Sequence, residues 1–187
     1  MSAVTLLSAC VVLEPRGGSA GISDAGTAIV LGPALDDFFV SGRLSLRQGD
    51  RRDFLKFDWQ HGPAHDTVLL LTPLGQGVAE LIRDDSGARL LRPGELPVVA
   101  SDIAMLMSQL LGTAMPLDEL GHWLSGRRGV SGSVAGWHVA VTQTMAHPSS
   151  PQGSLPRRLE ATRDDVSLTL IVDEWAEGDR PVDDKKL

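Results

Sequence analysis

Cys10 is the only cysteine in this chain of 187 residues, and its surroundings predict a covalent modification. It follows Leu7-Ser8-Ala9, which has the form of a bacterial lipobox. Small residues before the cysteine let a signal peptidase approach, and the thiol is then acylated. The glycine-rich segment 17–21 is typical of a flexible tether behind an anchor. The sequence therefore predicts lipidation at Cys10, and the alternative is an unmodified thiol in a disordered tail.

The segment before Cys10 has only part of the pattern of an export signal. Such a signal has a basic start and an apolar stretch of about 7 to 15 residues. Only residues 1–9 precede the cysteine, and none of them is basic. Either translation starts further upstream, which we favour, or this form of the chain is neither exported nor lipidated.

A second informative feature is the segment Thr72-Pro73-Leu74-Gly75-Gln76, which lies between two strand-like runs. Pro73 fixes one φ angle and Gly75 permits a left-handed one, so the segment predicts the turn of a β-hairpin. Turn tips are usually polar, yet this one carries a leucine. We expect Leu74 to be held out toward an apolar partner, although it could also fold back on its own hairpin or be a harmless exposed leucine.

The remaining chemistry-bearing residues do not form a catalytic pattern. His61 and His65 are four residues apart, but Gly62-Pro63 between them breaks a helix, and no acidic or cysteine partner stands at metal-ligand spacing. Ser131-Gly132-Ser133 lacks the flanking residues of a nucleophile elbow. We expect neither an enzyme nor a bound cofactor or metal.

Bulk composition narrows the class of protein further. The net charge is −7, and lysine and arginine are not gathered into a stripe, which disfavours a nucleic-acid partner. No apolar run is long enough for a transmembrane helix. The length suits one domain with a substantial core.

Strand patterns dominate the part of the chain that contains Leu74 and must position it. Apolar and polar residues alternate with a period of two, as in an antiparallel sheet with one wet face. We expect strands in the ranges 40–46, 55–59, 68–71, 78–82, 88–91, 137–141, 158–163 and 166–172.

Two helices are expected in the middle of the chain. Ser101-Asp102 can cap a helix that ends at Gly112, and a second helix is expected from Pro116 to Gly126. A polar loop is expected at 147–156. The fold class is therefore α+β, with an antiparallel sheet and two inserted helices. We divide the chain into a signal, lipidation site and tether (1–34), one domain (35–176) and a disordered charged tail (177–187).

An ordered set of short motifs resembles the LolB family of bacterial outer-membrane lipoprotein receptors. Each motif alone is weak, but the set spans residues 38–175 in order and stands behind a lipobox. The motifs are Phe39-Val40-Ser41-Gly42-Arg43-Leu44, Phe57-Asp58-Trp59-Gln60, Leu70-Leu71-Thr72-Pro73-Leu74-Gly75-Gln76, Leu111-Gly112, Met115-Pro116-Leu117, Leu120, Trp123-Leu124-Ser125-Gly126, Gly136-Trp137 and Asp173-Glu174-Trp175.

The resemblance implies a fold and a function. The fold is an incomplete, or half, antiparallel β-barrel around an apolar cavity, with the helices as a lid. The function is to accept triacylated lipoproteins from the periplasmic carrier LolA and to insert them into the outer membrane without ATP. The resemblance assigns the insertion step to the leucine of the protruding loop, here Leu74 between Pro73 and Gly75. Val11 after the cysteine agrees with sorting to the outer membrane.

The apolar faces of the expected elements supply candidates for the cavity wall, although the same stripes would also line an ordinary packed core. The candidates are Leu44, Leu46, Leu55, Phe57, Trp59, Ile103, Leu106, Met107, Leu110, Val139, Val141, Leu168 and Leu170. The flexible thioether of methionine suits a surface that accepts varied acyl chains.

The expected partners follow from the resemblance. They are a LolA-like periplasmic carrier, acylated lipoprotein cargo and outer-membrane lipid. The protein itself is expected to be a monomer that is lipid-anchored and faces the periplasm. Two other functions stay open. One is a soluble periplasmic carrier of lipid or lipoprotein, and the other is a non-enzymatic lipoprotein of an outer-membrane assembly machine.

Overall fold

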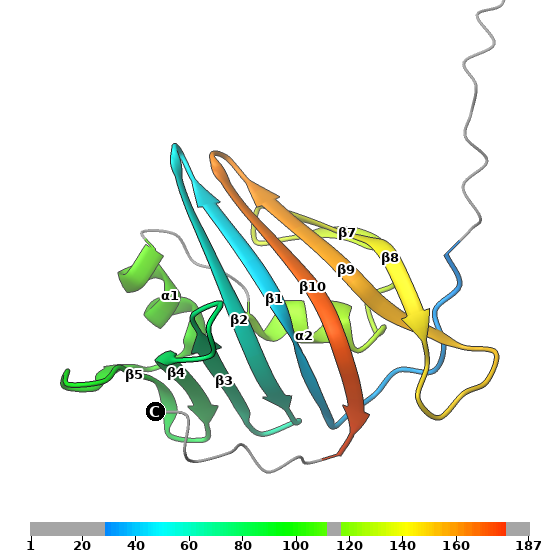
Figure 1. Cartoon of the computed structure of the whole chain (residues 1–187), viewed down its shortest axis with the longest axis horizontal. Helices are drawn as coiled ribbons and strands as arrows, with labels where there is room; N and C mark the ends of the chain where they lie inside the picture. Colours follow the sequence, from blue (N-terminus) through cyan, green and yellow to red (C-terminus); the bar gives the residue numbers. More distant parts are fainter. Residues whose placement is uncertain (1–28, 112–116, 179–187) are drawn as a thin grey trace, which may run out of the picture.

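The computed structural model describes residues 29–111 and 117–178, which form one curved antiparallel sheet and two helices (Figure 1). The sheet has the strand order β6-β5-β4-β3-β2-β1-β10-β9-β8-β7. It is open, because the edge strands β6 and β7 lie at opposite ends of that order. The α+β class and the antiparallel, unclosed sheet expected from the sequence are confirmed.

Nearly every strand pairs with its neighbour in the chain. The strands are β1 (Phe38–Gln48), β2 (Arg51–His61), β3 (Asp66–Leu71), β4 (Gly77–Asp84), β5 (Gly87–Leu91), β6 (Val98–Ala100), β7 (Ser131–Val134), β8 (Trp137–Ala146), β9 (Ser154–Arg163) and β10 (Val166–Glu177). The exception is β6 and β7, which are the two edges of the sheet, and the pairing of β1 with β10 joins its two halves. The short strands β6 and β7 were not expected from the sequence.

Gly42 marks a bulge at this central junction. The register of β1 against β10 shifts between Ser41 and Gly42. A Cβ atom built on Gly42 would lie 2.1 Å from the carbonyl oxygen of Ile171, so only glycine fits there. Bulges bend a strand and increase its twist, and this one lies where the two halves of the curved sheet meet.

Both helices lie on the concave side of the sheet (Figure 1). Helix α1 (Ile103–Leu111) packs on β5 and β6, and α2 (Leu117–Leu124) packs on β9. The predicted cap of α1 is present, because the Met105 amide donates to Asp102 Oδ1 at 2.7 Å. This bond and others to the carboxylate lower the pKa of Asp102. The expected limits at Gly112 and Pro116 fall outside the described residues.

The expected loop 147–156 is too long, since β9 already begins at Ser154. Pro156 lies inside this strand, opposite Thr144, where the register of β8 against β9 is irregular. Proline is tolerated at such irregular positions. Its carbonyl oxygen accepts a hydrogen bond from Trp175 Nε1 at 3.1 Å, which ties β9 to the end of β10.

The described start of the chain lies against the domain. The Gly32 amide donates to the Ser154 carbonyl at 2.8 Å, and the Leu35 amide donates to the Ser125 carbonyl at 3.2 Å. Gly32, within the predicted tether 1–34, therefore contacts the first residue of β9, and Leu35, the first residue of the predicted domain, contacts the residue after α2. At the other terminus β10 includes Glu177, which we had assigned to the tail.

Candidate functional site: an apolar pocket on the concave face

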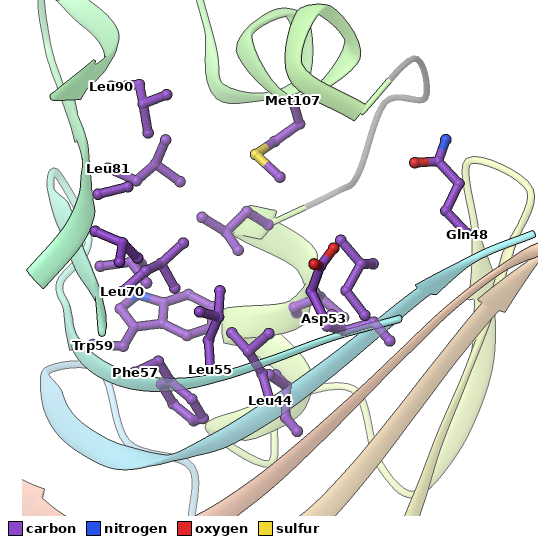
Figure 2. Close-up of a pocket in the computed structure, with 18 of the residues that line it drawn as sticks. Leu44, Gln48, Asp53, Leu55, Phe57, Trp59, Leu70, Leu81, Leu90 and Met107 are labelled. Atoms are coloured by element: carbon purple, nitrogen blue, oxygen red, sulfur yellow. The ribbon is translucent and has the colours of Figure 1, made fainter. Parts of the chain in front are cut away.

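A pocket of about 520 Å³ lies on the concave side, between the strands β1 to β5 and β10 and the two helices. Half of its lining residues are leucine, and Figure 2 shows apolar side chains converging from the strands, with Met107 of α1 opposite them. The lining residues are Leu44, Leu46, Gln48, Arg51, Asp53, Leu55, Phe57, Trp59, Val68, Leu70, Val78, Ala79, Leu81, Leu90, Arg92, Met107, Leu117, Leu120, Leu168 and Leu170.

The pocket leaves apolar side chains partly open to solvent. Leu44, Leu46 and Leu55 point to the concave side yet are only half-buried, as are Leu70 and Met107. In an ordinary packed core such residues would be covered. Concave apolar surface of this kind is characteristic of a ligand site.

One side of the pocket is polar. Gln48 and Asp53 lie on that side in Figure 2, away from the cluster around Leu81 and Leu90. Arg51 lines the same pocket and forms an ion pair with Asp53 at 2.8 Å. These residues belong to the free end of the β1–β2 hairpin. The pocket therefore combines an apolar interior with a charged side.

Eight of the thirteen residues predicted for the cavity wall line this pocket. They are Leu44, Leu46, Leu55, Phe57, Trp59, Met107, Leu168 and Leu170. Leu110 lies in α1, but its side chain is outside what the structure describes.

The other four predicted residues lie in packed core instead. Ile103 and Leu106 are buried in the face of α1 that packs on the sheet, while Met107 reaches the pocket. Val139 and Val141 are buried on β8. For these four the sequence identified the correct side of each element, but the space in front of them is filled.

Helix α2 fills the half of the concave face nearest β7, β8 and β9. Its Trp123 packs so closely on β7 that a Cβ atom on Gly132 would lie 3.0 Å from the indole ring. Leu124, next to it, is fully buried. The helix thus divides the concave side into a filled half at β7–β9 and an open half at β1–β5.

Several lining residues, most of them in the β3–β5 region and in α2, were not predicted from the sequence. They are Val68, Leu70, Val78, Ala79, Leu81, Leu90, Leu117 and Leu120, together with the polar Gln48, Arg51, Asp53 and Arg92. Period-two alternation in the hairpin and helical spacing in α2 would have identified most of the apolar ones.

The β3–β4 hairpin carries Leu74 at its tip. The Gly75 amide donates to the Thr72 carbonyl at 2.9 Å, and Gly75 has φ of 89°. The Thr72 amide donates to the Gln76 carbonyl at 2.8 Å, closing the hairpin below the turn. Leu74 is 91% exposed, the most exposed large apolar side chain of the described residues. It does not fold back onto its hairpin.

A buried ionic cluster lies beside the pocket wall, on the same face of the sheet. Asp66 is 1% exposed, and its Oδ1 accepts from Trp59 Nε1 at 2.8 Å and lies 2.6 Å from His61 Nδ1. Its other oxygen accepts from Arg83 Nε at 2.6 Å. Because Trp59 lines the pocket, Asp66 fixes part of the wall through this hydrogen bond.

The cluster continues into α2 through Asp118. Its Oδ1 lies 3.1 Å from Arg83 Nε, an ion pair that links the helix to β4. Burial raises the pKa of Asp118, and Arg83 opposes this shift. Gly121 allows the helix to approach closely, since a Cβ atom there would lie 3.0 Å from the His61 ring.

Other kinds of site find no support in the described residues. Within 29–111 and 117–178, no group of three or more His, Cys, Asp or Glu side chains could hold a metal ion. Neither of the two described helices has the length and apolar character needed to cross a membrane. Cys10 lies outside the described residues.

Comparison with known proteins identifies the family of the chain. The family model described as "Outer membrane lipoprotein LolB" matches residues 36–175. A protein named outer-membrane lipoprotein LolB from Azoarcus sp. (strain BH72) is 30% identical, and the match covers 91% of this chain and 89% of the relative. The protein of that name from Nitrosomonas europaea is 34% identical over 76% of this chain and 74% of its own.

A solved structure of a LolA superfamily protein from Nitrosomonas europaea also resembles the chain, with 13% identity and a TM-score of 0.44. The match covers 81% of this chain and 90% of that one, but so low a score does not establish a shared fold. The family match and the sequence relatives are sufficient on their own: this chain belongs to the outer membrane lipoprotein LolB family.

Proposed function

We propose that this chain accepts acylated lipoproteins from a LolA-like periplasmic carrier and inserts them into the outer membrane. The observation that carries the proposal is the leucine-rich pocket of about 520 Å³ on the concave face of a LolB-family domain. In this proposal the acyl chains of the cargo lie in the pocket, α1 and α2 act as its lid, and Leu74 touches the membrane during delivery.

The size of the pocket suits partial coverage of the cargo. Burying one methylene contributes roughly 0.8 kcal/mol, so three chains with about 45 methylenes would gain roughly 35 kcal/mol if fully buried. Non-covalent binding rarely exceeds about 18 to 21 kcal/mol. The volume of about 520 Å³ falls within the range of pockets for small ligands, roughly 300 to 1,000 Å³. A pocket that covers only part of the chains can bind the cargo and still release it.

The same balance explains how transfer proceeds without ATP. An acyl chain that moves from one apolar surface to another changes its exposure to water very little. Small differences in affinity between the carrier, the pocket and the bilayer are then sufficient to direct the cargo. The methionine in the wall adapts to chains of different shape.

The direct test uses purified protein, a LolA-like carrier loaded with a triacylated lipoprotein, and liposomes. We expect the cargo to leave the carrier, bind this chain and then float with the liposomes, in buffer without nucleotide. Cargo that stays on the carrier when this chain is added in excess would contradict the proposal.

Leu46→Glu tests whether acyl chains occupy the pocket. Leu46 is half-buried in the wall, whereas its neighbour Ser45 belongs to the other face of β1. A carboxylate in the pocket must lose its water when an acyl chain enters, so we expect affinity for a fluorescent acylated peptide to fall about tenfold or more. Ser45→Glu is the matched control and should bind as wild type. Equal affinity for the Leu46→Glu variant, with an unchanged melting temperature, would place the chains elsewhere.

The lasting attachment to the membrane is proposed to be the acylated Cys10, since one inserted leucine contributes only about 1.5 to 3 kcal/mol. Expression in a Gram-negative host with a complete upstream signal should place the protein in the outer membrane with a diacylglyceryl group on the cysteine. Mass spectrometry of the membrane fraction measures this directly. An unmodified thiol in that fraction would contradict the anchor and favour the soluble carrier.

A further inference from the structure

The loop between β5 and β6 carries a second exposed leucine. Leu96 is 89% exposed, almost the same as Leu74 at 91%, and no other large apolar side chain of the described residues is as exposed as these two. The loop was not part of any motif in the sequence. A single exposed leucine needs no explanation, but two such leucines on loops of one sheet do.

Both loops contain a turn with proline and a left-handed glycine, although Leu74 lies within its turn and Leu96 follows its turn. In the Leu96 loop the Glu95 amide donates to the Arg92 carbonyl at 3.2 Å, around Pro93 and a Gly94 with φ of 74°. Proline followed by a left-handed glycine is the pattern of a type II turn. Pro97 follows Leu96 and restricts it to extended backbone. Leu96 is therefore exposed in a restricted segment between a stiff turn and Pro97.

The order of the strands places both loops at the same end of the sheet. β3 runs toward the Leu74 tip, β4 runs back, and β5 runs toward the Leu96 loop, with antiparallel pairing throughout. Arg92, the first residue of the Leu96 turn, lines the pocket. The Leu96 loop therefore starts at the wall of the pocket.

A third apolar residue lies at this end. Phe54, on β2, is 60% exposed. It lies two positions before Lys56, and Lys56 pairs with Leu71, the last residue of β3. The Leu74 tip continues from Leu71, so Phe54 is level with that tip. Phe54 pairs with Ser45 on the convex face, so it is an exposed apolar residue at the same end of the sheet but not on the pocket side.

The charges of the two loops suit an uncharged partner. The Leu74 tip, residues 72–76, has no charged residue. In the Leu96 loop Arg92 and Glu95 neutralise one another at 3.0 Å. The chain as a whole carries −7, which would repel an acidic surface, yet the two tips themselves bring no net charge to their partner.

We propose that Leu96 is a second membrane contact, so that the domain meets the bilayer through two apolar tips beside the pocket. This inference rests on the proposed function, because it adds a contact to the same delivery step. A single tip would let the domain rotate about Leu74. Two tips on one stiff sheet hold that end of the sheet against the lipid, together with the pocket beside it. Their contributions to membrane affinity combine as in bivalent binding.

The test measures partition of the full chain, carrying Cys10→Ser to remove any anchor, onto phosphatidylcholine vesicles. We expect Leu96→Glu to lower the partition coefficient about tenfold, as Leu74→Glu does, and the double variant to lower it about a hundredfold. Val30→Glu is the matched control. Val30 is 71% exposed and lies at the opposite end of the sheet, where its carbonyl accepts from Ser154, so its variant should bind as wild type.

Each other outcome overturns the inference in a distinct way. If Leu96→Glu partitions as wild type while Leu74→Glu does not, the proposed function stands and Leu96 is not a membrane contact. If Leu96→Glu partitions normally but no longer takes cargo from the carrier, the loop contacts the carrier instead. If the wild type neither partitions nor delivers cargo, the proposed function fails together with this inference.

Discussion

Leu74→Glu is expected to lower delivery of lipoprotein to liposomes by about ten- to a hundredfold while cargo uptake stays normal. The side chain is 91% exposed on a closed turn, so its replacement costs no packing and the fold persists. Inserting one leucine into lipid contributes about 1.5 to 3 kcal/mol, and each 1.4 kcal/mol corresponds to a factor of ten. Flotation of labelled cargo with liposomes measures delivery, and binding of an acylated probe measures uptake.

Gln76→Glu is the control that separates charge from apolarity. Gln76 is exposed on the same tip, and its main-chain amide, not its side chain, donates to Thr72 Oγ1 at 3.1 Å. This variant adds the same charge and keeps the leucine, so it should deliver nearly as wild type. Equal delivery by Leu74→Glu and wild type would refute a membrane role for Leu74. A similar loss in both variants would show that the tip needs neutrality rather than a leucine.

Asp66→Ala is expected to lower the free energy of unfolding by about 3 to 5 kcal/mol. The carboxylate is buried and is the common partner of Trp59, His61 and Arg83. Removing it leaves the Trp59 N–H and the mostly buried Arg83 guanidinium without that partner, and broken buried ion pairs cost about this much. Urea denaturation followed by tryptophan fluorescence measures the change directly.

An exposed ion pair supplies the control for Asp66. Asp173 accepts two hydrogen bonds from Arg43, at 2.8 and 3.0 Å, but both side chains are about half exposed. Asp173→Ala should therefore cost at most about 1 kcal/mol. If Asp66→Ala lies as close to wild type as this control, the buried cluster is not what holds the β3–β4 hairpin and α2 in place.

Alternation made much of the sheet predictable from the sequence. Period-two patterns identified the long strands because each has one apolar and one wet face. The hairpin around Leu74 was predictable because Pro73 and Gly75 satisfy the geometry of its turn. The edge strands β6 and β7 were missed because three or four residues are too few to show a period.

The pocket itself was only partly predictable. Alternation identifies the side to which a residue points, but not whether the space on that side is filled. Val141 and Leu170 have the same pattern, yet Val141 lies in the filled half and Leu170 lines the pocket. The difference depends on where α2 packs, which is a tertiary effect. The ionic cluster is similar, because Asp66 and Arg83 are neighbours only through the pairing of β3 with β4.

The open sheet has a consequence for the tendency of the protein to aggregate. A sheet that does not close leaves two free edges, and exposed edges recruit strands from other chains into aggregates. Here the edge strands β6 and β7 have three and four residues, while the long strands β1, β2, β9 and β10 are paired on both sides. Because β7 pairs with β8 only as far as Ala140, the rest of β8 is the longest stretch of strand that β7 leaves uncovered. Most of the long strands are thus protected from pairing with a foreign strand, and we expect aggregation to begin, if anywhere, at the end of β8.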